Sequence, residues 1–348
     1  MNYIEKLRQS AKETGSIACM GLDPVVEALP RIHAGYGADN ILNFLDEIFI
    51  EMNKQNALPG AFKPNHGFYL KHDRPKDLLD SSSMARIDRP PHFSGSSALA
   101  RIIKEIRFIF EVFECIPVIL DYKRGDIATS SANYAAEGFE AWQADAVTVA
   151  PYMGTDSVMP FAKYCNDQDG KGVYVLCRTS NKGARDFQDL KVMPNGEELE
   201  KLIEENMVGE VPEGQLLKHL AEAVRESSMP VYMAVAHKIV DWAKENPGIG
   251  AVVGATYIKE MDEIARLFAG SGVDIPLLIP GVGGQGGSAS EVAAVLREAG
   301  YDLSLARINS SSGITHPWAK KKEPAPDDYA KVCTAELAKL NEQIGYKA

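Results

Sequence analysis

Val118-Ile-Leu-Asp-Tyr-Lys-Arg-Gly-Asp-Ile127 contains an apolar run that passes directly into a cluster of charged side chains. Apolar runs without alternation are typical of parallel strands that are buried on both faces. Because side chains alternate along a strand, Asp121 and Lys123 are expected to point the same way at its end, with Asp126 just beyond. Such a cluster is as compatible with a solvated ion pair in a loop as with an active site, because charge clusters mark sites only probabilistically.

Seven further short apolar runs are similar to this one, and helical patterns separate them. Strands that alternate with helices predict a parallel sheet, and eight of them fit a (β/α)8 TIM barrel. A doubly wound open sheet has the same local pattern and is the alternative fold. The expected strands are 17–22, 61–63, 118–123, 146–149, 173–177, 250–253, 276–279 and 305–309.

Two long connections interrupt this alternation, at about 66–96 and 185–229. The first is rich in Pro, Ser, Asp and Arg, and the second contains charged helical patterns. Barrels tolerate insertions in their βα connections, so we expect one barrel domain over residues 1–348 with two insertions. A C-terminal helix is expected at 327–344.

The composition restricts the classes of partner and compartment. Lys and Arg total 37 and Asp and Glu total 48, a formal net charge of −11, so neither nucleic acid nor an anionic membrane is expected as the main partner. The chain has no run of about twenty apolar residues, and no membrane span is predicted. The five cysteines lack CxxC spacing and the N-terminal stretch lacks a signal-peptide core, which predicts a cytoplasmic protein with reduced thiols.

Polar groups also stand at other expected strand ends. Lys63 closes the second strand, where it either extends to the surface or joins Asp121 in an alternating charge array. The glycine-rich segment 280–287 satisfies G-x-G-x-x-G, but it lies too late in the chain for a dinucleotide fingerprint and is better interpreted as a phosphate loop. Arg307, placed at the end of the eighth strand, would supply the charge and bidentate geometry that phosphate favours.

Weaker candidates follow the first and fifth strands. Asp23 is suited to bind a sugar hydroxyl, although helix capping explains it equally well. Thr179-Ser180-Asn181 would either hydrogen-bond the edge of a base or form an ordinary turn. The seven histidines lack HxH or HExxH spacing, so neither a metal site nor a cofactor is predicted, and no hydrolase signature occurs.

Taken together, these residues resemble the orotidine 5'-phosphate decarboxylase family, whose D-x-K-x-x-D-[IV] signature matches 121–127. The resemblance extends over all eight barrel units and favours the longer, bacterial-type subgroup. It implies a cofactor-free lyase that converts orotidine 5'-phosphate to UMP and CO2 in de novo pyrimidine biosynthesis. It also implies a homodimer in which Asp126 and Ile127 reach the partner's site, together with a hydroxyl near Ser130 or Thr129.

The resemblance implies a role for each candidate residue. Lys123, Asp121, Asp126 and Lys63 would form the catalytic charge array, with Lys123 as the proton donor to C6 of the pyrimidine. Asp23 would bind ribose, and Ser180 would contact the pyrimidine. The substrate phosphate would be bound by Pro280, Gly283, Gln285, Gly286 and Arg307.

Two other functions stay open. Magnesium-dependent sugar-phosphate decarboxylases and aldolases share D-x-K-x-x-D, but they usually carry an additional acidic ligand on strand two, where this chain has Lys63. A non-catalytic nucleotide-binding barrel would need only the phosphate loop, and crowded carboxylates would disfavour its anionic ligand. The metal-free decarboxylase is therefore preferred.

Overall fold

The computed structural model describes residues 1–30, 37–78, 93–110, 115–193, 201, 204, 213–283 and 286–347. Eight parallel strands form one sheet in the order β2-β1-β10-β9-β8-β5-β4-β3. Parallel bridges from Phe62 to Val118 and from Asn65 to Asp121 join the two outer strands, so the sheet closes into a barrel. The predicted (β/α)8 barrel is confirmed, and the open sheet is wrong.

Each strand lies within one residue of its expected bounds, because the β-branched apolar runs are buried on both faces. Full burial of one such side chain stabilises the folded state by about 1.5–3 kcal/mol. The strands are β1 (Ala18–Leu22), β2 (Ala61–Pro64), β3 (Ile119–Arg124), β4 (Ala146–Val149), β5 (Gly172–Arg178), β8 (Ile249–Val253), β9 (Leu277–Ile279) and β10 (Ala306–Ser310).

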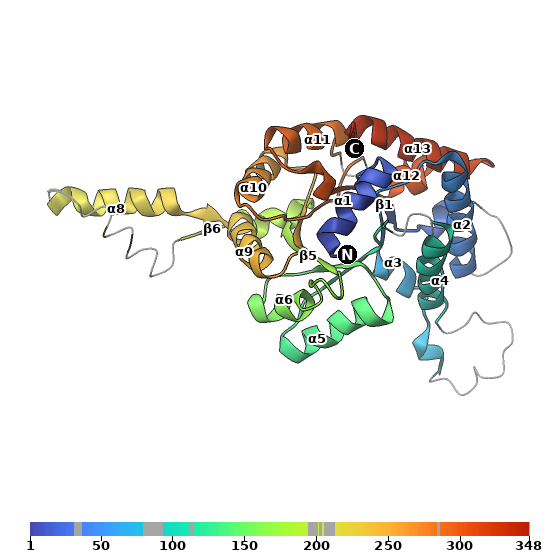
Figure 1. Ribbon diagram of the computed structural model, residues 1–348, viewed down its shortest axis with the longest axis horizontal. Helices are drawn as coiled ribbons and strands as arrows, with labels where there is room; N and C mark the ends of the chain where they lie inside the picture. Colours follow the sequence, from blue (N-terminus) through green and yellow to red (C-terminus); the bar gives the residue numbers. More distant parts are fainter. Residues whose placement is uncertain are drawn as a thin grey trace.

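Helices surround the barrel (Figure 1). Their buried residues are mainly apolar and join the core cluster. The outer helices are α2 (Gly37–Gln55), α4 (Ser94–Ile109), α5 (Ala128–Ala136), α6 (Thr155–Ala162), α9 (Val231–Glu245), α10 (Ile258–Gly270), α11 (Ala289–Glu298) and α13 (Tyr329–Ile344). The last of these confirms the expected C-terminal helix. All five cysteines are buried and free, and no helix in the described ranges is long and apolar enough to cross a membrane.

A further helix, α1 (Tyr3–Thr14), covers the end of the barrel where the strands begin. Asn2 and Glu5 form a capping box at its start, and Gly15, with φ 63°, ends it. Ser10 donates a hydrogen bond of 2.7 Å to the carbonyl of Gly60, the residue before β2. The ligand-binding end of the barrel is therefore the opposite one, where the strands end.

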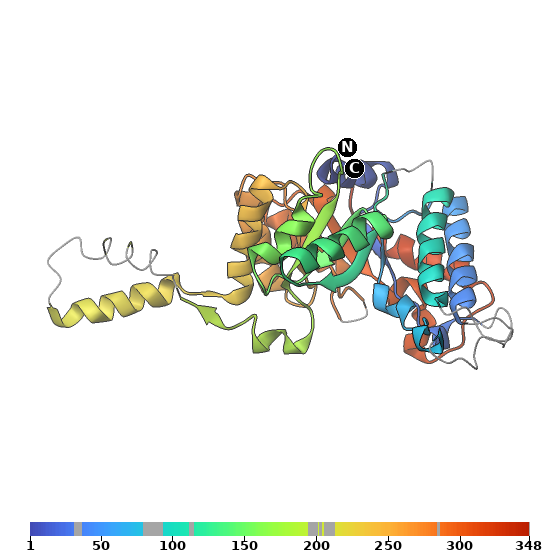
Figure 2. The same ribbon diagram turned by 90° about the horizontal axis from the view of Figure 1, so that it is seen from below.

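The two expected insertions are only partly described. In the first, α3 (His66–Leu70) and a 3-10 turn (Pro75–Leu78) precede α4, and 79–92 lie outside the described residues. In the second, β6 (Lys191–Val192) pairs antiparallel with β7 (Met229–Pro230), and α8 (Glu213–Ser227) extends away from the barrel (Figure 2). We call this second insertion, about 185–229, the arm. Gln188 at its base accepts a hydrogen bond from the amide of Thr179, just after β5, which brings the arm next to the site described below.

Candidate active site

A cavity of about 640 Å3 opens where the barrel strands end. The parallel register places the ends of β1 and β2 and Asp121 of β3 at the same height in the barrel. Leu22 on β1 pairs with Pro64 on β2, and the next residue, Asn65, bridges to Asp121. Apolar side chains from β5, β8 and β9 form part of the floor. The polar lining comprises Asp23, Lys63, Asn65, Asp121, Lys123, Thr148, Thr179, Ser180, Asn181, Asn309, Ser311, Ser312 and His316.

Asp121 is the centre of a charge array in this cavity. Its two carboxylate oxygens lie 3.0 Å from Lys63 Nζ and 2.6 Å from Lys123 Nζ. Lys63 Nζ also lies 3.9 Å from a carboxylate oxygen of Asp23. Lys63 and Asp121 are buried, whereas the side chain of Lys123 is 48% exposed toward the cavity mouth. The structure thus brings Lys63, Asp121 and Lys123 together within one chain.

The ionisation of the buried pair is fixed by its own charges. Burial opposes the charged form of Asp121, but the attraction of Lys63 and Lys123 outweighs it and holds the pKa of Asp121 well below its ordinary value. Burial likewise opposes the charged form of Lys63, but Asp121 and Asp23 raise the pKa of this lysine above its ordinary value. Both groups therefore stay ionised at neutral pH.

Thr148 on β4 holds the array in place, and the sequence analysis missed it. Its hydroxyl donates to Asp121 at 2.9 Å and accepts hydrogen bonds from the amides of Tyr122 (3.1 Å) and Lys123 (3.0 Å). The register between β3 and β4 shifts here, and Lys123 takes a left-handed backbone with φ 49°. Such a conformation costs energy in a non-glycine residue and is frequent at functional sites.

Asp126, Ile127 and Ser130 do not line this cavity. The Asp126 carboxylate accepts a hydrogen bond from the amide of Ile127 at 2.8 Å, just before α5. Ile127 is 54% exposed, and Ser130 is also exposed. The structure therefore separates these residues from Lys63, Asp121 and Lys123 within one chain.

The first three residues of the predicted phosphate loop form part of the wall of the cavity. Pro280 lines the cavity with Gly281 and Val282, while Gly283 lines an adjoining cavity. Gly281 and Gly283 have φ of 101° and 75°, which only glycine adopts without strain. Gly286 is exposed beyond them, and Gln285 lies outside the described residues.

The prediction that Arg307 binds phosphate is wrong. Arg307 is the second residue of β10 and is completely buried at the end of the barrel where the strands begin. Its guanidinium donates hydrogen bonds of 2.7–3.0 Å to the backbone carbonyls of Leu7, Gly60, Ser304 and Ala306. These hydrogen bonds hold the guanidinium at the end of the barrel where the strands begin, away from the cavity at the other end.

Ser180 lines the cavity, and the arm described above fixes its loop. Gln188, at the base of the arm, accepts a hydrogen bond from the Thr179 amide at 3.0 Å and donates to the Thr179 hydroxyl at 2.8 Å. Buried Arg178 forms an ion pair of 2.9 Å with Asp189. The second insertion thus orders residues 179–181, a role that its charged composition does not predict.

Two polar groups of the cavity, Asn309 and His316, were absent from the sequence-based candidates. Asn309 has a buried side-chain oxygen without a hydrogen-bond partner in the described structure, as does the predicted candidate Asp23, so both are free to bind a ligand hydroxyl or amide. Burial lowers the pKa of His316 despite the opposing effect of Asp23, and its ring lies 2.8 Å from the Thr315 hydroxyl. Within the described ranges, no three His, Cys, Asp or Glu side chains gather as metal ligands.

Comparison with known proteins gives a consistent result. Residues 91–316 match the model of the orotidine 5'-phosphate decarboxylase / HUMPS family. The chain is 34% identical to orotidine 5'-phosphate decarboxylase of Cupriavidus metallidurans, over 92% of both chains, and 30% identical to that of Cellvibrio japonicus, over 99% and 98%. Leishmania donovani OMP decarboxylase has a similar fold, with a TM-score of 0.61 and 24% identity over 99% of this chain and 100% of that one.

Proposed function

The chain belongs to the orotidine 5'-phosphate decarboxylase / HUMPS family, and we propose that it converts orotidine 5'-phosphate into UMP and CO2 in de novo pyrimidine biosynthesis. The observation that carries this proposal is the ionised array of Lys63, Asp121 and Lys123 inside the cavity. The array places a proton donor beside a carboxylate in a partly desolvated site, where charges interact strongly.

The reaction breaks the bond between C6 of the pyrimidine and its carboxylate. The electron pair stays on C6, CO2 leaves, and the Lys123 ammonium stabilises the C6 carbanion and then donates a proton to it. Because the carbanion has no conventional electron sink, the barrier is lowered by electrostatic interactions that strengthen as charge develops on C6. Solvent returns the proton to Lys123, whose side chain is 48% exposed.

The other residues position the substrate and the donor. Asp121 orients Lys123 through their 2.6 Å ion pair, and Lys63 balances the charge of Asp121. Asp23, with its free oxygen, binds the ribose hydroxyls, and Ser180 contacts the pyrimidine. The loop beginning at Pro280 receives the phosphate, and its distant binding energy contributes to the transition state.

A mechanism without metal is supported by the position of Lys63. Its ammonium lies between the carboxylates of Asp121 and Asp23, at 3.0 and 3.9 Å. A divalent cation that used these two carboxylates as ligands would meet the lysine charge at the same place. The magnesium-dependent barrel enzymes are therefore a poorer match to this site.

A homodimer with shared sites is supported by the surface beside the cavity. Ile127, Tyr152 and Met153 are 54%, 92% and 43% exposed, and their loops meet at Gly125 and Ala150. An apolar patch of this kind fits a second copy of the chain, which would contribute Asp126 and Ile127 to the site. The free, buried cysteines support a cytoplasmic location.

The activity is tested by the loss of orotidine 5'-phosphate absorbance in EDTA, beside Lys123→Ala. Conversion to UMP that survives EDTA and falls by several orders of magnitude in the variant is expected. Activity that returns only on adding magnesium, or only toward a sugar phosphate, would move the protein to the metal-dependent barrels. Absence of any reaction with UMP still bound would indicate a nucleotide-binding barrel.

The shared site is tested by mixing Lys123→Ala with Asp126→Ala after dissociation and reassociation. Each variant alone is expected to be nearly inactive. A mixed dimer would carry one site with both intact residues, so the mixture should recover about a quarter of the wild-type activity. No recovery, in a sample shown to contain mixed dimers, would place Asp126 outside the partner's site.

A further inference from the structure

The charges in the cavity do not balance those of the proposed substrate. Orotidine 5'-phosphate carries a carboxylate and a phosphate whose own charge is about −1.5 to −2 at neutral pH. The charged residues of the described lining are Asp23, Asp121, Lys63 and Lys123, whose formal charges cancel. Both lysines already pair with carboxylates, and Arg307 faces the other end of the barrel. The phosphate end therefore needs a cation from outside this lining.

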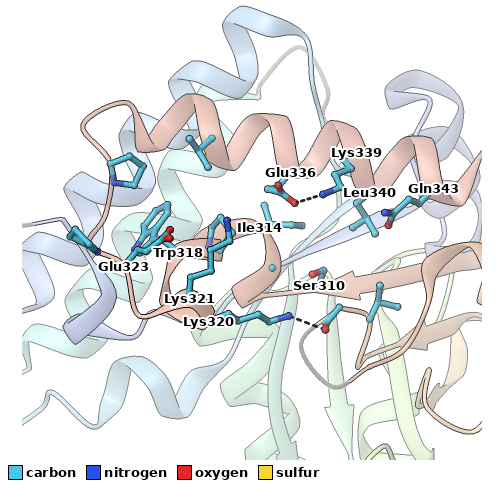
Figure 3. Close-up of a pocket in the computed structure, with 17 residues that line it drawn as sticks. Ser310, Ile314, Trp318, Lys320, Lys321, Glu323, Glu336, Lys339, Leu340 and Gln343 are labelled. Carbon is cyan, nitrogen blue, oxygen red and sulfur yellow. Dashed lines mark hydrogen bonds and ion pairs between the residues drawn. The ribbon is translucent and has the colours of Figure 1, made fainter.

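Lys320 is a cation that reaches the phosphate loop from outside. It lies in the 3-10 turn Pro317–Lys321 after β10, and its Nζ donates a hydrogen bond of 2.9 Å to the carbonyl of Gly283 (Figure 3). Gly283 follows Val282, which lines both the active-site cavity and an adjoining cavity of about 520 Å3 that contains Lys320. Ser310, the last residue of β10, also lines the adjoining cavity, and Ser311 and Ser312 continue into the active site.

The charge of Lys320 is uncompensated in the described structure. Its hydrogen-bond acceptor is a neutral carbonyl, and no described carboxylate lies within 4.0 Å of its Nζ. Lys339 in the same cavity differs, because it pairs with Glu336 at 3.7 Å (Figure 3). Lys321 and Glu323 also line that cavity, so their formal charges cancel. An ammonium has three donors, so Lys320 is able to keep its bond to Gly283 and to donate to a phosphate oxygen.

We propose that Lys320 binds the phosphate of the substrate, in the role that the sequence analysis gave to Arg307. This inference rests on the proposed function, because it assumes a nucleotide monophosphate in the active-site cavity. Lys320 would supply the missing positive charge and, through Gly283, would hold the loop against the phosphate. Its contribution would be to binding the phosphate group and not to the chemistry at C6.

The test compares Lys320→Ala with Lys320→Arg and with the control Lys331→Ala, an exposed lysine on α13 outside both cavities. Calorimetry measures the Kd of UMP and of uridine, which lacks the phosphate, and steady-state kinetics measures kcat and KM for orotidine 5'-phosphate. In Lys320→Ala, UMP should bind about 10- to 100-fold more weakly and kcat/KM should fall similarly, since a hydrogen bond to a charged group is lost. Uridine binding should change less than about two-fold, and arginine should restore most of the loss.

Unchanged UMP affinity in Lys320→Ala would overturn the inference, as would an equal weakening of UMP and uridine, which indicates a general structural effect. An equal loss in Lys331→Ala would show that only overall charge matters, and would also overturn it. These outcomes are separable from the proposed function, which the wild-type turnover of orotidine 5'-phosphate tests alone. If the wild type turns over and Lys320→Ala binds UMP normally, only the role of Lys320 fails.

Discussion

Thr148→Val tests whether a single hydroxyl on β4 holds the catalytic array. The substitution keeps the shape of the side chain but removes a 2.9 Å hydrogen bond to ionised Asp121, worth about 1.5–3 kcal/mol. It also leaves the buried amide of Tyr122 without its 3.1 Å acceptor, at a cost of about 1 kcal/mol. The sum of about 3 kcal/mol, spread over 348 residues, corresponds to a fall in Tm of about 4 °C.

The catalytic effect should exceed the effect on substrate affinity. Thr148 accepts from the amide of Lys123, whose left-handed backbone aims the ammonium, so its loss should lower kcat about 10- to 100-fold with little change in KM. The assay combines thermal melting with decarboxylation kinetics, and Thr148→Ser, which keeps the hydroxyl, is the matched control. Full kcat in Thr148→Val with the expected loss of Tm would show that the hydroxyl supports the fold only. An unchanged Tm and an unchanged kcat would refute the whole argument.

Three further predictions concern residues around the site. Arg307→Met should destabilise the fold by about 2–4 kcal/mol in urea denaturation, because it leaves buried carbonyls unpaired, and should not change KM; a raised KM at normal stability would return Arg307 to the phosphate site. Gln188→Ala should raise KM about 5-fold by loosening 179–181 while kcat changes less, and wild-type kinetics would remove the arm from substrate recognition. Burial opposes ionisation of Asp145, but Lys6 and Arg107 lower its pKa below the ordinary value, so its stabilisation is present above about pH 4 and is lost as pH falls. Between pH 7 and 3 the free energy of unfolding of Asp145→Asn should therefore fall less than that of the wild type. An equal fall in both proteins would contradict this.

The barrel was predictable because its strands carry their own signal. Parallel strands buried on both faces need β-branched apolar runs, and each such run stands between helical patterns. Helix α1 was harder, because its sequence is polar on one face and precedes the first strand. The capping pair Asn2 and Glu5 marks the start of α1. The burial of Tyr3 and Leu7, however, is explained only by the packing of α1 against the end of the barrel.

Residues of the candidate site were predictable where they directly follow an apolar run of the sequence. Lys63, Asp121 and Lys123 follow this rule, and the closed barrel brings them together. Thr148 carries no comparable signal, since a single threonine inside a strand is compatible with the core as well as with a site. Gln188 is similar, because its contact with Thr179 depends on how the arm folds back on β5.

Arg307 and Lys320 show how the position within an element determines which end of a barrel a side chain serves. A strand rises about 3.3 Å per residue, so Arg307 at the second position of β10 lies roughly 10 Å from Ser310 at its end. An error of three residues in the predicted position along a strand thus places a cation at the wrong end of the barrel. Lys320 comes ten residues after β10 ends, and only the turn that folds back to Gly283 brings its charge to the loop. The charge balance of the folded cavity is therefore a better guide to the residue that binds an anion than the position of an arginine in the sequence.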